Sequence, residues 1–309
     1  MRIALAANGR MGLGLLRALQ DSRHEVVVLV RDGRTLKGAW RWLDHAGGML
    51  GGPWTVEGRA FSSGVPNVWL ARQDQREVNR LAGYRPDLLL VGNFGLILKA
   101  PVLDVPAVGT VNTHWSLLPH HRGPNPSTSV LLHGEVETGL TFHVVDTRID
   151  AGDILDQVAF PIGPDDTATS LYVRACEEAE RRVVELVDRI EQDGLVGQVQ
   201  DLRAGSYHKR VTPEGAVLDF SQPCEVLDRK VRALTSPMAR FTHRGRTVYV
   251  SAARPVKAVD DAPGTIIATR PAPIIACGEG GLAITAAWTV MPPGPWPGVI
   301  GGPKVGERV

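Results

Sequence analysis

Short apolar runs alternate with amphipathic segments through the first part of the chain. Runs rich in Val, Leu and Ile predict buried strands at residues 2–7, 25–30, 87–91 and 109–113. Segments with helical spacing of apolar residues, around 13–19 and 75–81, lie between them. Continuous apolar strands separated by helices are typical of a parallel sheet covered on both faces. The pattern therefore predicts an α/β domain with a Rossmann-like parallel sheet.

The pattern continues with two more strands and a long helix. Strands are predicted at 139–145 and 152–158, joined by residues 146–151. The helix at 167–192 has an apolar stripe at three- and four-residue spacing, formed by Leu171, Ala175, Ala179, Val183, Leu186 and Ile190. Asp166 or Thr167 can cap its start, and Gly194 can end it. We expect this helix to close the first domain.

The last third of the chain has a different pattern. Short strand candidates at 216–220, 246–251, 264–269, 273–277 and 281–285 are separated by turn residues, and the Pro- and Gly-rich tail at 292–302 is predicted to be a loop. Such a series predicts a small, OB-like antiparallel β-barrel. The predicted organisation is a catalytic domain at 1–195, a linker at 196–206 and a substrate-binding β-barrel domain at 207–309.

One long segment, residues 31–63, predicts no regular structure. It is rich in glycine and carries Trp40, Trp42 and Trp54. Long loops of this kind are usually functional or partly disordered. The tryptophans could cover a ligand or pack the loop onto the domain, and the sequence leaves both open.

Composition excludes several classes of protein. Of the 309 residues, 43% are hydrophobic and 22% charged, which is typical of a globular protein, and the net charge is only +1. Residues 205–309 carry 13 Lys and Arg against 8 Asp and Glu, a charge of +5, so this part could meet an anionic partner. The three cysteines lie far apart, which predicts no zinc site and no disulfide framework. We expect a cytoplasmic protein with no signal peptide, no membrane span and no metal.

The candidate chemistry begins at the end of the strand at 109–113. Asn112 and His114 are two residues apart, so their side chains point to the same face. Open α/β sheets bind ligands at the carboxyl ends of their strands. A carboxamide and an imidazole can together stabilise an oxyanion on an attacked carbonyl, and histidine can exchange protons near neutral pH. Taken alone, this pair could equally well satisfy backbone groups.

Asp150 strengthens the catalytic interpretation. It lies in the carboxylate-rich turn between the strands at 139–145 and 152–158. A carboxylate beside His114 would favour the charged imidazole and fix its orientation. The alternative for Asp150 is a turn residue that bonds to its own backbone.

An ordered string of motifs connects these residues. They are Asn112-x-His114-x-Ser116-Leu117-Leu118-Pro119, Arg122-Gly123, Glu137-Thr138-Gly139 and Asp150-x-Gly152-Asp153-Ile154-Leu155. Together they resemble the signature of the folate-dependent formyltransferases. The segment from Tyr207 to Phe220 and the segment 231–235 resemble the start of the family's C-terminal domain. This coverage disfavours the purine-pathway members, which resemble only the first domain.

The resemblance implies a donor, a set of roles and no metal. It implies that Asn112, His114 and Asp150 are catalytic and that 10-formyltetrahydrofolate supplies the formyl group. The donor would be bound by Phe94, Gly95, Leu96, Ile97 and Leu98, together with the turn that contains Asp146 and Asp150. Contacts with the acceptor are expected from Ser116, Arg122 and Gly123.

The acceptor is a primary amine, and two kinds are open. Full-length resemblance favours methionyl-tRNA. Residues 31–63 lack the Pro- and Arg-rich loop of the tRNA-directed members, which favours a small amine such as a nucleotide-linked amino sugar. A formyl-folate hydrolase uses similar residues and stays a further alternative. A non-catalytic binding module is disfavoured because all three catalytic residues are present. No protein partner is implied.

Overall fold

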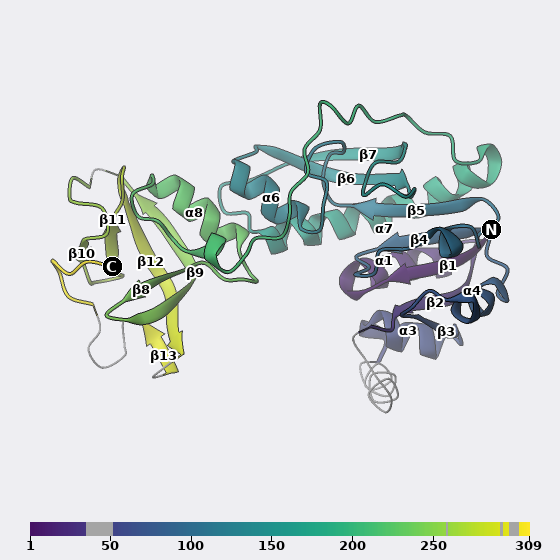
Figure 1. The fold of residues 1–309 in the computed structure, drawn as a ribbon, viewed down its shortest axis with the longest axis horizontal. Coiled ribbons are helices and arrows are strands. Elements are labelled where there is room, and N and C mark those ends of the chain that lie inside the picture. Colours follow the sequence, from purple (N-terminus) through teal and green to yellow (C-terminus); the bar gives the residue numbers. More distant parts are fainter. Residues whose placement is uncertain (35–51, 258, 291–292, 297–302) are drawn as a thin grey trace. The chain divides into compact units, whose positions relative to one another are not determined.

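The computed structural model describes residues 1–34, 52–257, 259–290, 293–296 and 303–309. These residues form two compact units (Figure 1). The first consists of Met1–Pro126, Glu137–Phe160 and Tyr172–Tyr207, and the second of Ser127–Val136, Pro161–Leu171 and His208–Val309. The domain boundaries expected from the sequence stay a prediction. Within the described ranges, no helix combines the length and apolar character needed to cross a membrane.

A seven-stranded sheet forms the centre of the first unit, in the order β3-β2-β1-β4-β5-β6-β7. Its strands are β1 (Arg2–Ala7), β2 (Glu25–Asp32), β3 (Asn67–Leu70), β4 (Leu88–Gly92), β5 (Gly109–His114), β6 (Glu137–Val144) and β7 (Ile154–Pro161). The first five pair in parallel, and β6 pairs antiparallel with β5. β1 and β4 are almost wholly buried, as their apolar sequences require. The predicted Rossmann-like sheet is confirmed.

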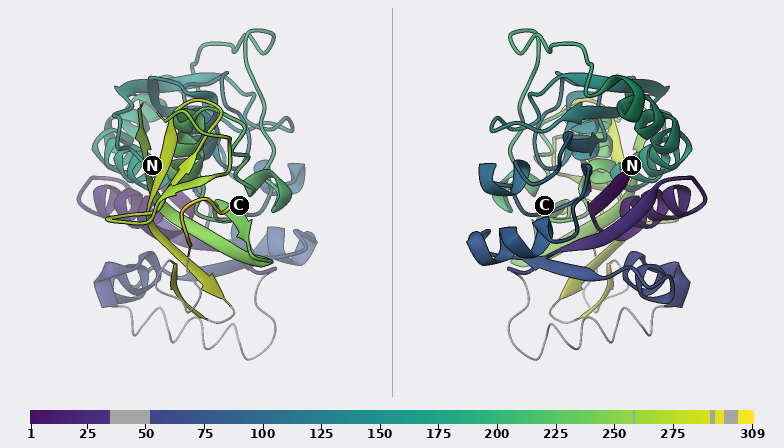
Figure 2. Two further views of the ribbon diagram at one scale, coloured as in Figure 1. Left: turned by 90° about the vertical axis from the view of Figure 1, so that its left-hand side faces the viewer. Right: turned by 90° about the vertical axis from the view of Figure 1, so that its right-hand side faces the viewer.

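Helices cover both faces of this sheet. They are α1 (Gly9–Gln20), α3 (Val56–Ser62), α4 (Gln75–Ala82), α5 (Ala100–Leu103) and α7 (Ala168–Asp193). Figure 2 shows α1 and α7 on one side of the sheet and α4 on the other. Val78 and Leu81 of α4 are buried in a core cluster with side chains of the strands. Burial of these apolar residues is the main stabilising contribution.

The long helix α7 begins and ends where the sequence predicts. The hydroxyl of Thr167 accepts the backbone N–H of Ser170 at 3.1 Å, so Thr167 caps the helix. At the other end, Gly194 has a φ of 76° and its N–H donates to the carbonyl of Ile190. The positive φ is the left-handed conformation in which glycine commonly ends a helix.

The second unit contains an antiparallel sheet in the order β10-β11-β12-β9-β8, with β13 paired to β12. Its elements are α6 (Pro126–His133, with Pro126 in the first unit), η2 (Glu214–Ala216), α8 (Cys224–Ala233), β8 (Arg240–His243), β9 (Arg246–Val256), β10 (Ile266–Ala268), β11 (Ile274–Ala276), β12 (Gly281–Val290) and β13 (Pro293–Trp296). Leu227 and Val231 of α8 are buried, and the rings of Phe220 and Phe241 meet edge to face at 5.5 Å. The antiparallel β domain is confirmed, and its closure into a barrel stays a prediction.

Some predicted elements of the second unit are wrong. Residues 216–220 do not form a strand: a 3-10 turn ends at Ala216, and Val217 forms only an isolated bridge with Arg240. In the tail predicted to be a loop, Pro293–Trp296 is a strand, because it pairs with β12. Helix α8 and strand β8 were not predicted.

The described part of the segment 31–63 contains a helix. Its Val56–Ser62 portion is helix α3, capped by Thr55, whose hydroxyl accepts the N–H of Gly58 at 3.0 Å. The prediction of no regular structure is wrong there. Trp54 is 83% exposed, so its indole is not packed onto the domain. Trp40 and Trp42 lie outside the described residues.

Candidate active site

The candidate site lies at the carboxyl end of β5, in the first unit. Residue pairing sets Asn112 of β5 opposite His143 of β6 in the antiparallel ladder. The side-chain Nδ2 of Asn112 is 3.1 Å from Nε2 of His143. His114 follows two residues later on β5, and its ring is 5% exposed. The end of one central strand therefore carries both residues that the sequence predicts to stabilise an oxyanion.

The loop after β5 folds back onto His114. Nε2 of His114 lies 3.1 Å from the backbone carbonyl of His121. A carbonyl only accepts, so this ring nitrogen carries a hydrogen. Ser116 is fully buried, and its hydroxyl donates to the carbonyl of His120 at 2.8 Å. Its hydroxyl holds this loop, and the expected contact between Ser116 and an acceptor stays a prediction.

Asp150 projects from the turn between β6 and β7. One oxygen, Oδ2, accepts the backbone N–H of Gly123 at 2.9 Å. The other, Oδ1, is 3.7 Å from Nδ1 of His114 and 3.8 Å from Nε2 of His143. The side chain of Asp150 is 15% exposed. The structure thus brings Asp150 beside His114, as predicted. The backbone N–H of Gly123 orients the carboxylate.

The backbone of the turn requires a glycine two residues later. A Cβ atom at Gly152 would lie 2.0 Å from the carbonyl oxygen of Val144, far inside van der Waals contact. The turn is also held by Gln200, whose side-chain amide donates to the carbonyls of Asp150 and Gly152 at 3.2 and 2.6 Å. This close approach explains the glycine in the Asp-x-Gly motif.

A cavity of about 160 Å³ opens beside these residues. It is lined by two segments and by the strand ends between them: Val91, Phe94, Leu96, Ile97, Leu98, Asn112, His143, Val145, Asp146, Thr147, Arg148, Ile149 and Asp150. The two segments are those predicted to hold the donor. Of the predicted donor contacts, only Gly95 does not line the cavity; its carbonyl accepts a hydrogen bond from Arg34 at 2.5 Å.

The wall formed by residues 94–98 is held by a buried glutamine. The side-chain amide of Gln73 donates to the carbonyl of Ile97 at 2.9 Å, and its oxygen accepts the N–H of Lys99 at 2.7 Å. Gln73 is 6% exposed. Sequence reasoning did not find this residue, because nothing near it in the chain indicates a partner about 25 positions away.

The opposite wall carries an ion pair. Arg148 binds the carboxylate of Asp146 at 2.7 Å, and the same carboxylate accepts the backbone N–H of Arg148 at 2.6 Å. Both side chains are partly exposed, so the pair itself contributes little stability. It orients the carboxylate of Asp146 within its own turn.

His143 is the functional residue that sequence reasoning missed. Its side chain is 2% exposed and lines the cavity. Burial, reinforced by the neighbouring His114, lowers the pKa of His143 to about 4, although Asp150 opposes the shift. The ring is therefore neutral near pH 7. Its place opposite Asn112 follows from strand pairing, which the sequence alone did not reveal.

Arg122 lies beside the site, and one atom of its side chain has no hydrogen-bond partner among the described residues. Its Nε–H is buried and donates no hydrogen bond within the part of the chain that the structure describes. The backbone N–H of Arg122 donates to the carbonyl of Ser206 at 3.0 Å, which holds the loop after β5. Its predicted contact with the acceptor stays a prediction.

Two groups of side chains outside the cavity bear on metal binding. His24, Asp188 and Glu191 have ligand atoms within 4.8 Å of one another. Arg23 pairs with both carboxylates at 2.6 Å. Because a cation of the protein already occupies the two acidic groups, this is best described as an ion-pair cluster.

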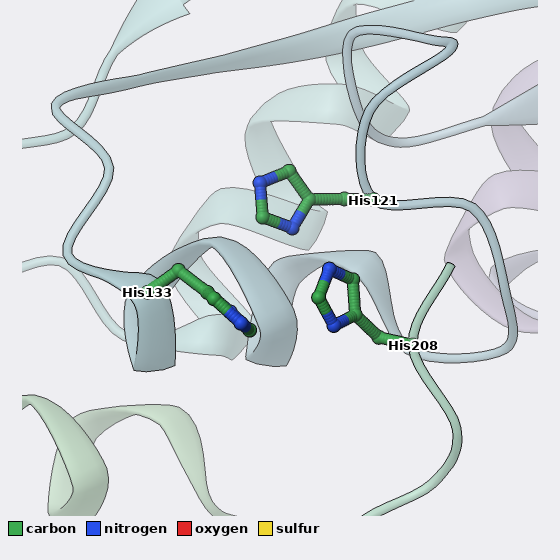
Figure 3. Close-up of side chains that lie close together, drawn as sticks. All are labelled: His121, His133 and His208. Carbon is green, nitrogen blue, oxygen red and sulfur yellow. The ribbon is translucent and has the colours of Figure 1, made fainter. Parts of the chain in front are cut away.

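The second group contains histidines of the second unit. Figure 3 shows His133 of α6 and His208, whose ring centroids are 4.3 Å apart; His121, also labelled there, belongs to the first unit. Nδ1 of His133 is 2.8 Å from the carbonyl of Ser129. Two imidazoles alone supply fewer ligands than a zinc centre ordinarily has.

Two family models match the chain. Residues 62–187 match the model of the formyl transferase family, and residues 210–288 match that of the formyl transferase C-terminal domain. A methionyl-tRNA formyltransferase of Methylococcus capsulatus is 34% identical over 297 residues, which cover 95% of this chain and 93% of that protein.

Solved structures resemble the fold. WlaRD, a sugar 3N-formyl transferase crystallised in the presence of dTDP and 5-N-formyl-THF, superposes with a TM-score of 0.67 at 18% identity, covering 94% of this chain and 98% of WlaRD. A methionyl-tRNA formyltransferase from Clostridium thermocellum superposes with a TM-score of 0.57 at 16% identity, covering 82% of this chain and 93% of that one. At these identities the likeness shows the fold alone.

Proposed function

The chain belongs to the formyl transferase family, and from this premise we propose that it moves a formyl group from 10-formyltetrahydrofolate to the amino group of methionyl-tRNA. The observation that carries the proposal is the cluster at the end of β5. Asn112 and Asp150 line one cavity, and Nδ1 of His114 is 3.7 Å from Oδ1 of Asp150. A carboxamide, an imidazole and a carboxylate in this arrangement are suited to acyl transfer.

The cavity suits the donor as a substrate. Phe94, Ile97 and Ile149 give it apolar walls that can receive a flat heterocycle. The Asp146–Asp150 turn forms the opposite wall, where its backbone groups would supply donors and acceptors to the donor molecule. The donor brings an activated formyl group bound to a nitrogen. Residues 94–98 and the turn would hold the ring, so that the formyl carbon lies near Asn112.

The reaction is a direct acyl transfer. The amine nitrogen forms a bond to the formyl carbon, and the bond between that carbon and the folate nitrogen breaks. The leaving nitrogen takes up a proton, and the attacking amine loses one. Asn112 donates an N–H to the oxygen on which negative charge develops. A single donor of this kind is worth about 3–4 kcal/mol of barrier reduction.

His114 and Asp150 act as a pair. Nε2 of His114 carries a hydrogen, which it donates to the carbonyl of His121. A second hydrogen, on Nδ1, therefore makes the ring cationic. The carboxylate of Asp150 stabilises that cation, and the cation stabilises the oxyanion. Asp150 also accepts the proton of the amine through a water molecule. Gly123 keeps the carboxylate aimed at the ring through its N–H.

The choice of methionyl-tRNA rests on the relative from Methylococcus capsulatus. Its 34% identity extends over almost the full length of both chains, and the C-terminal domain is included. Residues 208–309 of the second unit carry 13 Lys and Arg against 8 Asp and Glu, a charge of +5, and its other two segments add Glu135, Asp165 and Asp166, so the unit as a whole has a charge of +2. Lys and Arg on such a unit can neutralise RNA phosphates.

A second acceptor is favoured by separate observations. The sugar 3N-formyl transferase WlaRD superposes over 98% of its length. Residues 31–63 carry glycines and tryptophans in place of an Arg-rich loop. Both support an amino sugar linked to a nucleotide as the acceptor, with the same donor and the same three residues.

The test compares the two acceptors with one donor. The full chain is incubated with 10-formyltetrahydrofolate and either methionyl initiator tRNA or a dTDP-linked amino sugar, and kcat/KM is measured for each. A higher value for the tRNA, falling steeply with salt concentration, supports the proposal. A higher value for the sugar, with little salt dependence, contradicts the proposed acceptor. Formate release without transfer to either would identify a hydrolase instead.

The matched variants are Asn112→Ala and Asn79→Ala. Asn79 is an exposed residue of α4, so its replacement is expected to leave turnover unchanged. Loss of turnover only in Asn112→Ala, with the donor still bound, supports the site assignment. Equal activity of the two variants would contradict it.

A further inference from the structure

The Asn112 side chain can stabilise an oxyanion only if its amide group, rather than its carbonyl oxygen, faces the formyl oxygen. An asparagine side chain can rotate by 180° and exchange its oxygen and nitrogen with little change in shape. The hydrogen-bond partner of the side chain therefore decides which atom lies where. The partner that the structure provides is His143, at 3.1 Å.

The His143 ring has one nitrogen fixed by the backbone. Its Nδ1 lies 2.8 Å from the carbonyl oxygen of Val144, which only accepts, so Nδ1 carries the hydrogen. In the neutral ring Nε2 is then an acceptor. Nδ2 of Asn112 donates to it, whereas the carbonyl oxygen of Asn112 in that place would meet a lone pair.

Burial of the ring is the main reason that it stays neutral. Burial and His114 disfavour a positive charge on His143, and together they lower its pKa to about 4. Asp150, the carbonyl of Val144 and Asp146 oppose the shift, but they do not reverse it. The ring stays an acceptor toward Asn112 near neutral pH.

We propose that His143 is a positioning residue, whose Nε2 holds the Asn112 carboxamide in the orientation that leaves the second N–H free for the formyl oxygen. The use of the second N–H by the formyl oxygen rests on the proposed function. The hydrogen-bond geometry itself stands independently of it. His143 makes no contact with the reacting atoms in this account, and it acts through Asn112 alone.

The test is a set of variants of the full chain. His143→Leu removes the acceptor, and His143→Gln can restore one through its side-chain oxygen. We expect kcat to fall about tenfold in His143→Leu, less than the ~100-fold or greater loss from removing an oxyanion donor outright. His143→Gln should recover most of that loss. A His143→Leu enzyme with wild-type kcat would overturn the inference.

A double-mutant comparison distinguishes a positioning role of His143 from a general effect of the substitution on the cavity. In an Asn112→Ala background, His143→Leu should lower kcat by less than about twofold, because nothing is left to position. Val145→Ala, which also removes side-chain atoms from the cavity wall, is the control, and its effect should multiply with that of Asn112→Ala. If the effects of His143→Leu and Asn112→Ala multiply, His143 has a merely structural role.

A spectroscopic measurement keeps the inference testable without turnover. Nitrogen NMR of the protein labelled at its nine histidines, with His143 assigned by its loss in His143→Gln, reports the position of the hydrogen. We expect the neutral ring with the hydrogen on Nδ1 throughout pH ~6–8. A hydrogen on Nε2, or a charged ring in that range, would overturn the inference even if the proposed function failed. Transfer by the wild type with wild-type kcat in His143→Leu would overturn it while the function stood.

Discussion

Replacement of Asp150 by asparagine removes one charge while preserving the shape of the site. The amide that replaces the carboxylate keeps an oxygen for the N–H of Gly123, which is now 2.9 Å from Oδ2. What is lost is the attraction between the carboxylate and a positive charge on His114, 3.7 Å away, together with the acceptor for the amine proton that Asp150 is proposed to provide. Because that charge stabilises the oxyanion, we expect the loss to appear in kcat.

The magnitude follows from the distance. Two unit charges about 3.7 Å apart attract each other by about 4 kcal/mol at an effective dielectric constant of about 20. Partial exposure of Asp150 reduces this value, so about 2–4 kcal/mol is expected to be lost from the transition state. At about 1.4 kcal/mol per factor of ten, kcat falls by about 30- to 1,000-fold.

The assay is steady-state transfer from 10-formyltetrahydrofolate at saturating acceptor, with donor binding followed separately. Asp104→Asn, at an exposed position after α5, is the control and should retain wild-type turnover. A kcat of Asp150→Asn within about threefold of wild type would refute the reasoning, because it would leave less than about 0.7 kcal/mol for the charge pair. Loss of donor binding together with kcat would instead indicate a collapsed turn.

Three further changes test other parts of the structure. Gly152→Ala places a Cβ 2.0 Å from the Val144 carbonyl, so the turn must move; we expect a lower melting temperature and weaker donor binding, and an unchanged melting curve would contradict this. Gln73→Ala frees the wall at 94–98, so KM for the donor should rise several-fold with kcat nearly unchanged; a fall in kcat alone would speak against it. Arg244 lowers the pKa of the Glu307 carboxyl from 4.5 to about 2. Since the folded pKa lies below the unfolded one, this group stabilises the protein above pH ~4.5 and loses that effect as pH falls toward about 2. Melting temperatures of wild type and Glu307→Gln should therefore differ at neutral pH and converge on acidification, and a constant difference would contradict the assignment.

Local sequence was sufficient for six of the seven strands of the central sheet, and the short edge strand β3 was not predicted. Buried parallel strands such as β1 and β4 are apolar at nearly every position, so a short window identifies them. The long helix α7 was likewise identified by its own spacing and by Thr167 and Gly194 at its ends. Elements with weak local signals were missed. Strand β8 is four residues long and depends on pairing with β9.

The candidate site likewise contains residues that the sequence predicted and residues that it did not. Asn112, His114 and Asp150 were predicted because two lie at one strand end, the third lies in a carboxylate-rich turn, and all three fall in motifs that resemble those of the folate-dependent formyltransferases. His143 was missed because its role depends on the register between β5 and β6, which no local pattern contains. Gln73 and Gln200 hold the two walls of the cavity across long stretches of chain. Only the folded chain brings such groups to their partners.

The most direct test of the central claim is a single reaction of the wild-type chain with 10-formyltetrahydrofolate labelled with carbon-13 in the formyl group. Methionyl initiator tRNA is the acceptor, and the released aminoacyl group is analysed by mass. The account predicts methionine that carries one labelled formyl group, formed by the wild type and at least about 100-fold more slowly by Asn112→Ala. Unmodified methionine from the wild type, with the donor bound and the label unreacted or released as formate, would contradict it.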